Sequence, residues 1–188
     1  MSDKPSMFYT PNVLEKIRNY YYSTKKPDKP KFDIALHIRR GDVNNVDLDQ
    51  IWRYTSNKVY IKIIQFLKNT YPDYSICIHS QGKINDFKEL FFENVHFSLN
   101  DSIDNTFHNL VTSKILVMSK SSFSYSAALL STNIVYYIPF WHKTLDNWLT
   151  IDNLELWLEE FDQKYDYRKR LIYMQQFKTN KKFDQKYD

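Results

Sequence analysis

Two adjacent arginines offer the clearest chemistry in this sequence. Arg39 and Arg40 follow the apolar run 32–38, within the segment 37–42 that reads His-Ile-Arg-Arg-Gly-Asp. Guanidinium groups that leave a buried strand must meet anions or water, and a diphosphate offers paired oxygens that match their fork geometry. An ion pair with Asp42 satisfies only one of the two easily. We therefore predict that this segment binds the diphosphate of a ligand.

A group of serines lies between another apolar run and a helical pattern. Ser119, Ser121, Ser122 and Ser124 surround Phe123 in the segment Ser-Lys-Ser-Ser-Phe-Ser. Hydroxyl and backbone N–H groups at the start of a helix can cap the helix, and they can also bind a phosphate. Plain N-capping needs one serine rather than four, so the pattern favours a phosphate site and leaves capping as the alternative.

The sequence has only two glycines, and each follows a predicted strand. Gly41 comes after the arginine pair, and Gly82 comes after His79, Ser80 and Gln81. Glycine suits positions where the backbone turns sharply or approaches a ligand closely, and both interpretations remain open here. The three polar side chains before Gly82 can reach a base or a ribose, although a histidine satisfied within the strand end is an equal alternative.

An aromatic run follows the last predicted strand. Phe140, Trp141 and His142 are consecutive, and Trp148 lies nearby. Such side chains can form the wall of a sugar site, but large aromatic residues after a strand are more often part of the core. We therefore expect core packing here and keep the sugar wall as the alternative.

The sequence predicts no metal site and no disulfide. The five histidines are scattered, and no Asp-x-Asp pattern that could bind magnesium directly follows a predicted strand. The single cysteine, Cys77, lies inside an apolar run and is expected to be buried. Charge neutralisation of an anionic ligand must then come from arginine.

Apolar runs of strand length alternate with helical patterns from residue 31 onward. We predict strands at 32–38, 74–80, 95–99, 115–119 and 134–138, and helices at 54–69, 85–92, 105–113 and 124–130. This alternation is typical of βαβ units. It predicts an α/β, Rossmann-like, mostly parallel sheet with helices on both faces. Ligands of such sheets bind at the carboxyl ends of the strands, where all the polar segments above are located.

Three regions are predicted along the chain. Residues 1–30 form an N-terminal helix at 11–22 and a linker at 25–30 that prolines interrupt. Residues 31–150 form the ligand-binding domain. Residues 151–188 form a helical extension, with helices at 154–161 and 167–177, and a basic tail.

Composition limits the classes of partner. The 26 Lys and Arg and the 22 Asp and Glu are interspersed, so a nucleic-acid partner is not expected, and the Lys-rich ends support only a weaker polymer-binding hypothesis. The N-terminus lacks a signal-peptide pattern, and no apolar run approaches the roughly 20 residues that span a bilayer. We therefore expect no membrane span and a cytoplasmic location.

With these residues in view, the chain resembles the fucosyltransferase superfamily, which is built on the two-domain GT-B plan. The segment 37–42 is similar to its first motif, His-x-Arg-Arg-x-Asp. The segment 121–128, Ser-Ser-Phe-Ser-Tyr-Ser-Ala-Ala, is similar to the Ser-Ser-Phe-Ser segment of the α1,2 branch. The match covers about residues 32–142, so the chain resembles the C-terminal donor domain.

The resemblance implies an activity and a donor. It implies transfer of fucose from GDP-fucose to a glycan acceptor, with inversion at the sugar carbon and without a metal or other cofactor. His37 is then near the guanosine, Arg39 binds the β-phosphate, and Arg40 supports that site. Ser121, Ser122 and Phe123 surround the diphosphate in the same way.

Two further residues follow from the resemblance. In the α1,6 branch an acidic residue about ten positions after the motif histidine is implicated in catalysis, and Asp47 stands at that offset. Thr106 stands where some relatives carry an acidic residue that binds guanine. The expected catalytic residues are Arg39, Arg40 and Asp47, and the full expected donor site comprises His37, Arg39, Arg40, Asp42, His79, Ser80, Gln81, Gly82, Thr106, Ser119, Ser121, Ser122, Phe123 and Ser124.

Two functional hypotheses remain open at this point. The first is an active glycosyltransferase, in which the C-terminal helices, a partner subunit or a separate polypeptide hold the acceptor. The second is a catalytically inactive nucleotide-sugar-binding module that partners a full transferase. The first predicts sugar transfer, and the second predicts nucleotide binding with neither transfer nor donor hydrolysis.

Overall fold

The computed structural model describes residues 8–24, 26–28, 30–44 and 53–151. The chain divides into two compact units, Met1–Asp152 and Asn153–Asp188, and every described element belongs to the first. The helices predicted at 154–161 and 167–177, and Asp47, lie outside the described residues. The predicted division at residues 30 and 150 stays a prediction.

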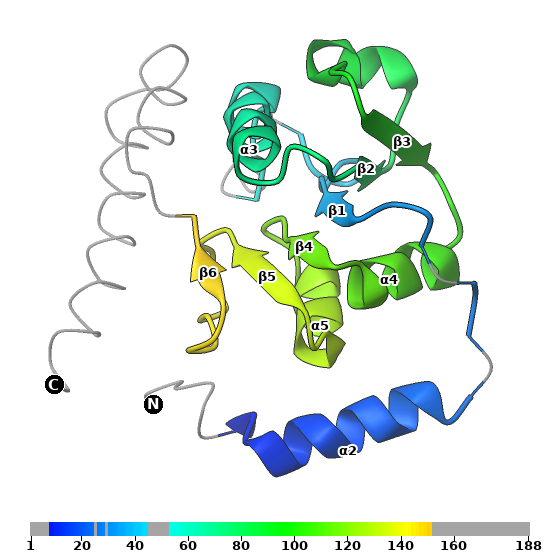
Figure 1. Ribbon diagram of the computed structural model, residues 1–188, viewed down its shortest axis with the longest axis vertical. Coiled ribbons are helices and arrows are strands. Elements are labelled where there is room, and N and C mark those ends of the chain that lie inside the picture. The colour runs from blue at the N-terminus through cyan, green and yellow to red at the C-terminus, as the bar shows by residue number, and fades with distance from the viewer. Residues whose placement is uncertain (1–7, 25, 29, 45–52, 152–188) are drawn as a thin grey trace, which may run out of the picture. The chain divides into compact units, whose positions relative to one another are not determined.

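The described residues form one six-stranded sheet in the order β3-β2-β1-β4-β5-β6 (Figure 1). Each neighbouring pair is parallel, and the order reverses between β1 and β4, as in a doubly wound fold. The predicted α/β, Rossmann-like class is therefore confirmed. The strands are β1 (Ile34–His37), β2 (Ile76–Ser80), β3 (Val95–Leu99), β4 (Ile115–Val117), β5 (Ile134–Tyr137) and β6 (Leu149–Thr150).

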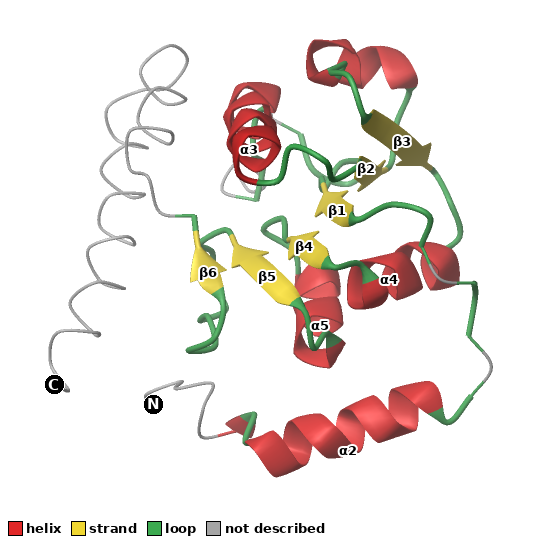
Figure 2. Ribbon diagram, in the orientation of Figure 1, coloured by secondary structure: helices red, strands yellow, loops and turns green. Residues whose placement is uncertain are grey.

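Helices cover both faces of the sheet (Figure 2). They are α2 (Pro11–Tyr22), α3 (Asn57–Thr70), the 3-10 helix η1 (Ile84–Leu90), α4 (Ile103–Thr112) and α5 (Ser122–Leu130). In Figure 1, α3 and η1 lie on one side of the sheet and α4 and α5 on the other, with α2 outside them. Among the described residues, no helix is long and apolar enough to cross a membrane.

The central strand β1 is buried along its whole length because helices pack on both its faces. Its side chains alternate, so Ala35 lies in register with Leu116 and Val135 and joins the core under α4 and α5. His37 is two residues further along and shares that face. The apolar strand therefore delivers its last side chain to the buried base of α5.

The amino ends of three strands are fastened by one carboxylate. Asp33 Oδ2 accepts hydrogen bonds from Ser75 N at 3.0 Å and from Ser75 Oγ at 2.9 Å. Asp33 Oδ1 lies 2.7 Å from Lys114 Nζ. The hydrogen bond from Lys114 lowers the pKa of Asp33, with help from the Ser75 donors. These contacts join the starts of β1, β2 and β4.

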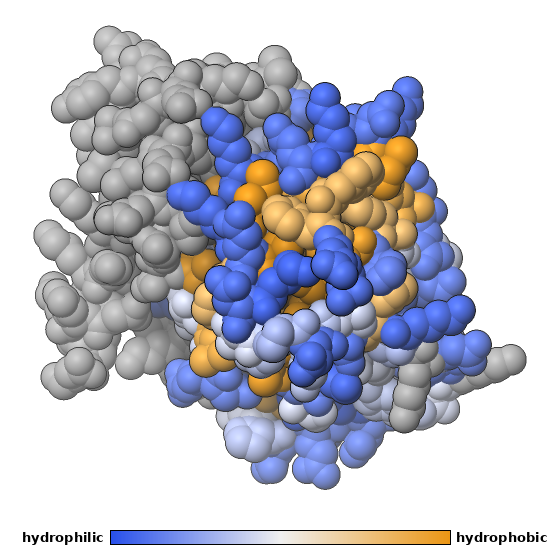
Figure 3. All heavy atoms as spheres, turned by 45° about the horizontal axis from the view of Figure 1, so that its top comes forward, coloured by the Kyte–Doolittle hydropathy of each residue, from blue (hydrophilic) through white to orange (hydrophobic). Residues whose placement is uncertain are grey.

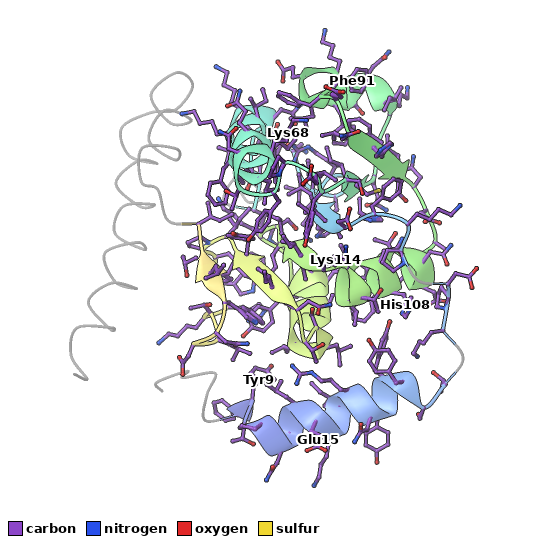
Figure 4. The ribbon with its side chains drawn as sticks, viewed as in Figure 1. Tyr9, Glu15, Lys68, Phe91, His108 and Lys114 are labelled. Carbon is purple, nitrogen blue, oxygen red and sulfur yellow. The ribbon has the colours of Figure 1, made fainter. Side chains whose placement is uncertain are left out.

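Helix α2 packs against the core beneath α4 and α5. Arg18 donates from Nε to Leu130 O at 3.2 Å and from Nη2 to Ser131 O at 3.0 Å, which satisfies carbonyls at the end of α5. His108 of α4 lies on the side that faces α2 (Figure 4), and its Nδ1 is 2.8 Å from the phenolic oxygen, Oη, of Tyr21. The N-terminal helix is thus part of the first unit.

Most element predictions agree with the structure to within a few residues. The bounds of α2 and β3 are those predicted. A sixth strand was not predicted: Leu149–Thr150 forms strand β6 beside β5. Two exposed residues are too short a run to show a strand pattern. The predicted helix at 85–92 is a 3-10 helix, and α5 begins at Ser122, two residues earlier than predicted.

Candidate functional site

A cavity of about 750 Å³ opens at the carboxyl edge of the sheet. Its volume falls within the range of small-molecule sites, and its place matches the usual ligand position of a doubly wound sheet. The side chains that line it come from the ends of β1 and β2 and from the segments near α4, α5 and β5. They are His37, Ile38, Arg39, Arg40, Asp42, Arg53, Ser80, Gln81, Asp101, Ile103, Thr106, Ser121, Ser122, Phe123 and Trp141.

Arg39 forms a two-pronged ion pair at the mouth of this cavity. Its Nη2 lies 2.6 Å from Asp42 Oδ2, and its Nε donates to Asp42 Oδ1 at 3.2 Å. The hydrogen bond from Arg39 lowers the pKa of Asp42. The Arg39 side chain is 19% exposed, whereas that of Asp42 is 61% exposed. The guanidinium is therefore the covered partner of this pair, and the carboxylate is the exposed one.

Arg40 is held by the protein itself. It donates to Arg39 O at 2.9 Å, to Thr55 O at 2.9 Å and to Asn57 Oδ1 at 3.0 Å. Its guanidinium also lies 4.4 Å from the centre of the Tyr54 ring. These contacts tie the loop after β1 to the start of α3, so the geometry favours a supporting role for Arg40 over direct contact with a ligand.

Both glycines have the positive φ that favours glycine. Gly41 has φ +83°, and a Cβ at this position would lie 2.4 Å from Gln81 Oε1. The loops after β1 and β2 therefore approach each other closely at the cavity. Gly82 has φ +125°, and its N–H donates to Asn100 Oδ1 at 3.0 Å, which fits the tight-turn interpretation.

The four serines have different roles in the structure. Ser121 is the N-cap of α5, where its Oγ accepts from Phe123 N at 3.2 Å. Ser119 and Ser124 are fully buried below it, and the Ser124 hydroxyl donates to Ser121 O at 3.2 Å. Ser122 is exposed in the cavity. Ser121 therefore caps the helix, and the buried Ser119 and Ser124 shape the loop before it. Because Ser121 and Ser122 line the cavity, the N-terminus of α5 faces it.

His37 forms part of the cavity floor. It is 8% exposed, and its Nδ1 lies 2.7 Å from Ser119 Oγ. Burial lowers the pKa of His37 to about 3, and the nearby His79 and Arg39 add to that effect. The imidazole is therefore neutral at physiological pH and offers one donor and one acceptor rather than a charge.

His79 lies beside His37 on the next strand but does not line the cavity. Burial lowers the pKa of His79 to about 4, against an opposing effect of Asp101. Within the described part of the chain its Nδ1 has no hydrogen-bond partner. Both interpretations of His79, a ligand contact and a satisfied strand-end histidine, therefore stay predictions.

The structure brings most of the predicted site residues to one cavity. Those that line it are His37, Arg39, Arg40, Asp42, Ser80, Gln81, Thr106, Ser121, Ser122 and Phe123. His79, Gly82, Ser119 and Ser124 do not line it, and Asp47 lies outside the described residues. Their roles in donor binding and catalysis remain predictions.

Five residues that line the cavity were not in the predicted donor site: Ile38, Arg53, Asp101, Ile103 and Trp141. Asp101 and Ile103 follow β3 and could have been found, because they occupy the same position relative to a strand end as the recognised segments. Arg53 precedes α3 and follows no strand, so no local signal marks it. Trp141 was assigned to the core, and the structure corrects this, since it is 41% exposed in the cavity.

Among the described residues, no group of three or more histidine, cysteine or acidic side chains is placed to hold a metal ion. The cavity instead presents the guanidinium of Arg39 beside the N-terminus of α5, whose partial positive charge also favours anions. This arrangement is suited to a phosphate or diphosphate.

Comparison with solved structures identifies similar chains, two of which are structures of the same enzyme. The E. coli heptosyltransferase WaaC with ADP has 15% sequence identity and a TM-score of 0.50, over 75% of this chain and 48% of that one. The same enzyme with ADP-2-deoxy-2-fluoro heptose also has 15% identity and a TM-score of 0.50, over 77% and 47%. No family model and no curated protein matches the sequence.

This likeness shows the fold. The chain has the Rossmann-like fold of a GT-B glycosyltransferase domain, and it spans about half the length of the solved structures that it matches. The likeness is to a heptosyltransferase, so it supports the GT-B plan named in the sequence analysis and does not extend to the fucosyltransferase family or its motifs.

Proposed function

We propose that this chain binds a nucleotide sugar at the carboxyl edge of its sheet and serves as the donor-binding part of a glycosyltransferase. The observation that carries the proposal is the position of Arg39. Its partly covered guanidinium lies in a cavity of about 750 Å³, in which the N-terminus of α5 is also exposed through Ser122. A diphosphate suits both partners at once.

The same geometry supports a transfer reaction. When a glycosyl bond to a diphosphate breaks, negative charge grows on the departing diphosphate. A guanidinium and helix N–H groups already in place stabilise that charge without reorganising. Arg40 contributes by fixing the loop that carries Arg39, through its bonds to Thr55 and Asn57. We accordingly propose that neutralisation by arginine makes the reaction independent of metal.

The neighbours support the class of donor. The two similar solved structures carry ADP and a nucleotide sugar, ADP-2-deoxy-2-fluoro heptose. Their likeness to this chain is one of fold, so the ligand class comes to this chain as a proposal. It agrees with the diphosphate chemistry that the cavity offers independently.

We further propose GDP-fucose as the donor and a glycan as the acceptor, with inversion at the sugar carbon. This finer proposal is supported by the motif resemblance of segments 37–42 and 121–124. The cavity also offers a carboxylate that can bind the guanine base, because Asp101 lines the cavity together with Thr106. Burial acts to raise the pKa of Asp101, but hydrogen bonds from Asn105, Ser102 and Ser98 outweigh it and keep the group ionised. An ionised carboxylate can accept the donors on the edge of guanine.

The test is calorimetric titration in EDTA of the purified chain with GDP, GDP-fucose, GDP-mannose, ADP and UDP-sugars. We expect selective binding of GDP ligands. Arg39→Ala should weaken binding about 10- to 100-fold, since hydrogen bonds to charged groups contribute about 1.5–3 kcal/mol. Lys88→Ala, which removes an exposed cation on η1, is the matched control and should bind as the wild type does.

The outcomes separate the levels of the proposal. Failure of every nucleotide to bind at millimolar concentration would rule out the nucleotide-sugar site. Preference for ADP ligands would keep the site and reject GDP-fucose. Binding followed by neither transfer nor donor hydrolysis, with glycan acceptors and candidate partner polypeptides present, would favour the inactive binding module over the enzyme.

A further inference from the structure

Trp141 differs from the other aromatic residues that follow β5. Phe140 packs against the core cluster under α4 and α5, and Trp148 belongs to that cluster at 7% exposure. Trp141 is 41% exposed and lines the cavity instead. Core packing therefore explains why Phe140 and Trp148 are aromatic, but it does not explain the indole of Trp141.

Exposure alone would not single out this residue. The described surface carries other large apolar side chains, such as Phe66 and Phe91, and Figure 3 shows apolar surface between hydrophilic groups on the face that it views. Scattered apolar residues are normal on a soluble surface. What distinguishes Trp141 is that its exposed ring forms the wall of a cavity built from charged and hydroxyl side chains.

The indole is also held in a defined orientation. Its ring makes an edge contact with Phe140 at 4.7 Å between centroids and lies 5.7 Å from the ring of His142. His142 is fixed in turn, because its Nε2 lies 3.0 Å from Ser122 Oγ and its ring lies 4.7 Å from that of Tyr125. The loop after β5 is thus anchored to the first two turns of α5, and the platform is preorganised.

A guanidinium accompanies the indole. Arg53 lies 5.4 Å from the centre of the Trp141 ring and lines the same cavity. Its charge also contributes to the lowered pKa of Asp42, so it lies within electrostatic reach of the Arg39–Asp42 pair. The wall therefore combines an aromatic surface with hydrogen-bond donors close to the proposed diphosphate position.

The order of the sheet gives the cavity a direction. Trp141 follows β5, and the α5 N-terminus follows β4. Ser80 is the last residue of β2, and Gln81 follows it. In the order β2-β1-β4-β5 these flanks are three strand spacings apart, about 14 Å. The proposed diphosphate position lies between them, so the two ends of the ligand must fall on opposite flanks.

We propose that Trp141 and Arg53 form the subsite for the pyranose ring of the nucleotide sugar. The indole packs against the C–H face of the ring, and Arg53 donates hydrogen bonds to ring hydroxyls. The nucleoside then occupies the opposite flank, beside Gln81, Asp101 and Thr106. This inference rests on the proposed function and assigns the sugar end of the same site.

The test compares the affinities of a nucleoside diphosphate and its sugar ester in the same variant. Titrations of GDP and GDP-fucose, and of ADP and an ADP-sugar, are made with wild type, Trp141→Ala, Trp141→Phe and Arg53→Gln. We expect Trp141→Ala to weaken binding of the nucleotide sugar about tenfold and to change binding of the nucleoside diphosphate less than about twofold. Trp141→Phe should recover part of the loss. Arg53→Gln should weaken both ligands, because its charge lies near the diphosphate position, and should weaken the sugar ester more than the nucleoside diphosphate.

Phe91→Ala is the matched control, because this exposed aromatic residue directly follows η1 (labelled in Figure 4) and does not line the cavity. Thermal unfolding of each variant checks that the fold is retained. If Trp141→Ala weakened binding of both ligands equally, the indole would contact the nucleobase rather than the sugar, and the proposal would be overturned. Unchanged binding of the sugar ester would also overturn it. Absence of any nucleotide binding to the wild type would overturn the proposed function and this subsite with it.

Discussion

The two edges of the sheet each carry an ion pair, and the pairs are built in opposite ways. At the amino edge the acid, Asp33, is the covered partner at 25% exposure, and Lys114 is exposed at 64%. At the carboxyl edge the cation, Arg39, is the covered partner at 19% exposure, and Asp42 is exposed at 61%. Asp33 also accepts two hydrogen bonds from Ser75, whereas Arg39 faces a cavity.

This difference separates a structural pair from a pair that can exchange its partner. At the amino edge the covered carboxylate of Asp33 already accepts hydrogen bonds from protein groups. The covered group of the carboxyl edge has an exposed carboxylate as its partner, and such surface ion pairs contribute little to stability. The role of a charged pair therefore follows from which member is covered and from what else that member contacts.

The largest effect should come from the amino edge. Asp33→Ala should lower the free energy of unfolding by about 1–2 kcal/mol, because the Ser75 donors lose a charged acceptor. The Asp33 pKa is lowered in the folded state, so this stabilisation is complete above the ordinary carboxyl pKa near 4 and is lost as the pH falls through the lowered value.

Urea unfolding at pH 7 and pH 3 measures this difference, which should be present at pH 7 and shrink at pH 3. Asp73→Ala, at an exposed position before β2, is the matched control and should change little. Nucleotide affinity should be unaffected by Asp33→Ala. A loss of affinity comparable to that of Arg39→Ala would show that the two edges are not independent.

A smaller effect is expected at the start of α5. Ser121→Ala removes the hydroxyl that accepts from Phe123 N, and loss of such a cap costs about 1 kcal/mol of stability. Ser122→Ala, one residue later and exposed, should cost less than about 0.5 kcal/mol. Thermal and urea unfolding of the two variants test this contrast, and equal losses would mean that the cap is not where the structure has it.

The smallest effect on stability is expected at Asp42. Asp42→Asn breaks the exposed ion pair and should cost no more than about 1 kcal/mol in unfolding experiments. Affinity for a nucleoside diphosphate should rise, since a competing carboxylate is removed from Arg39. A fall in affinity would show that Asp42 orients Arg39 for the ligand, and the carboxyl-edge pair would then resemble the structural pair after all.

The sequence predicted the fold well because each β-strand and helix carries its own local signal. The buried strands are short apolar runs, and segments that follow them reach one edge by topology alone, as Arg39, Gln81 and Ser121 do. Arg53 was missed because a loop residue before a helix reaches the cavity only through the tertiary fold. Trp141 was assigned to the core because an exposed aromatic residue and a buried one look alike in sequence.

The same limit applies to the arginine pair. The sequence marks Arg39 and Arg40 as equals. Both line the cavity, yet the structure gives Arg40 three internal acceptors and pairs Arg39 with the exposed Asp42. Two of those acceptors, Thr55 O and Asn57 Oδ1, belong to a distant segment. Strand β6 was missed for a related reason, since its two residues become a strand only through pairing with β5.

The all-parallel order of the strands has a consequence for how the protein is made. The central strand pairs with β2 through Ile34 and Ile76 and with β4 through Ile34 and Ile115, so each pairing must wait for a long crossover. Contacts so distant along the chain are slow to form. During synthesis the arginine segment leaves the ribosome early, but the cavity closes only after residue 141 has emerged. Until then the nascent chain has the arginine segment without the complete cavity, so a ligand that needs the whole cavity cannot yet stabilise the fold.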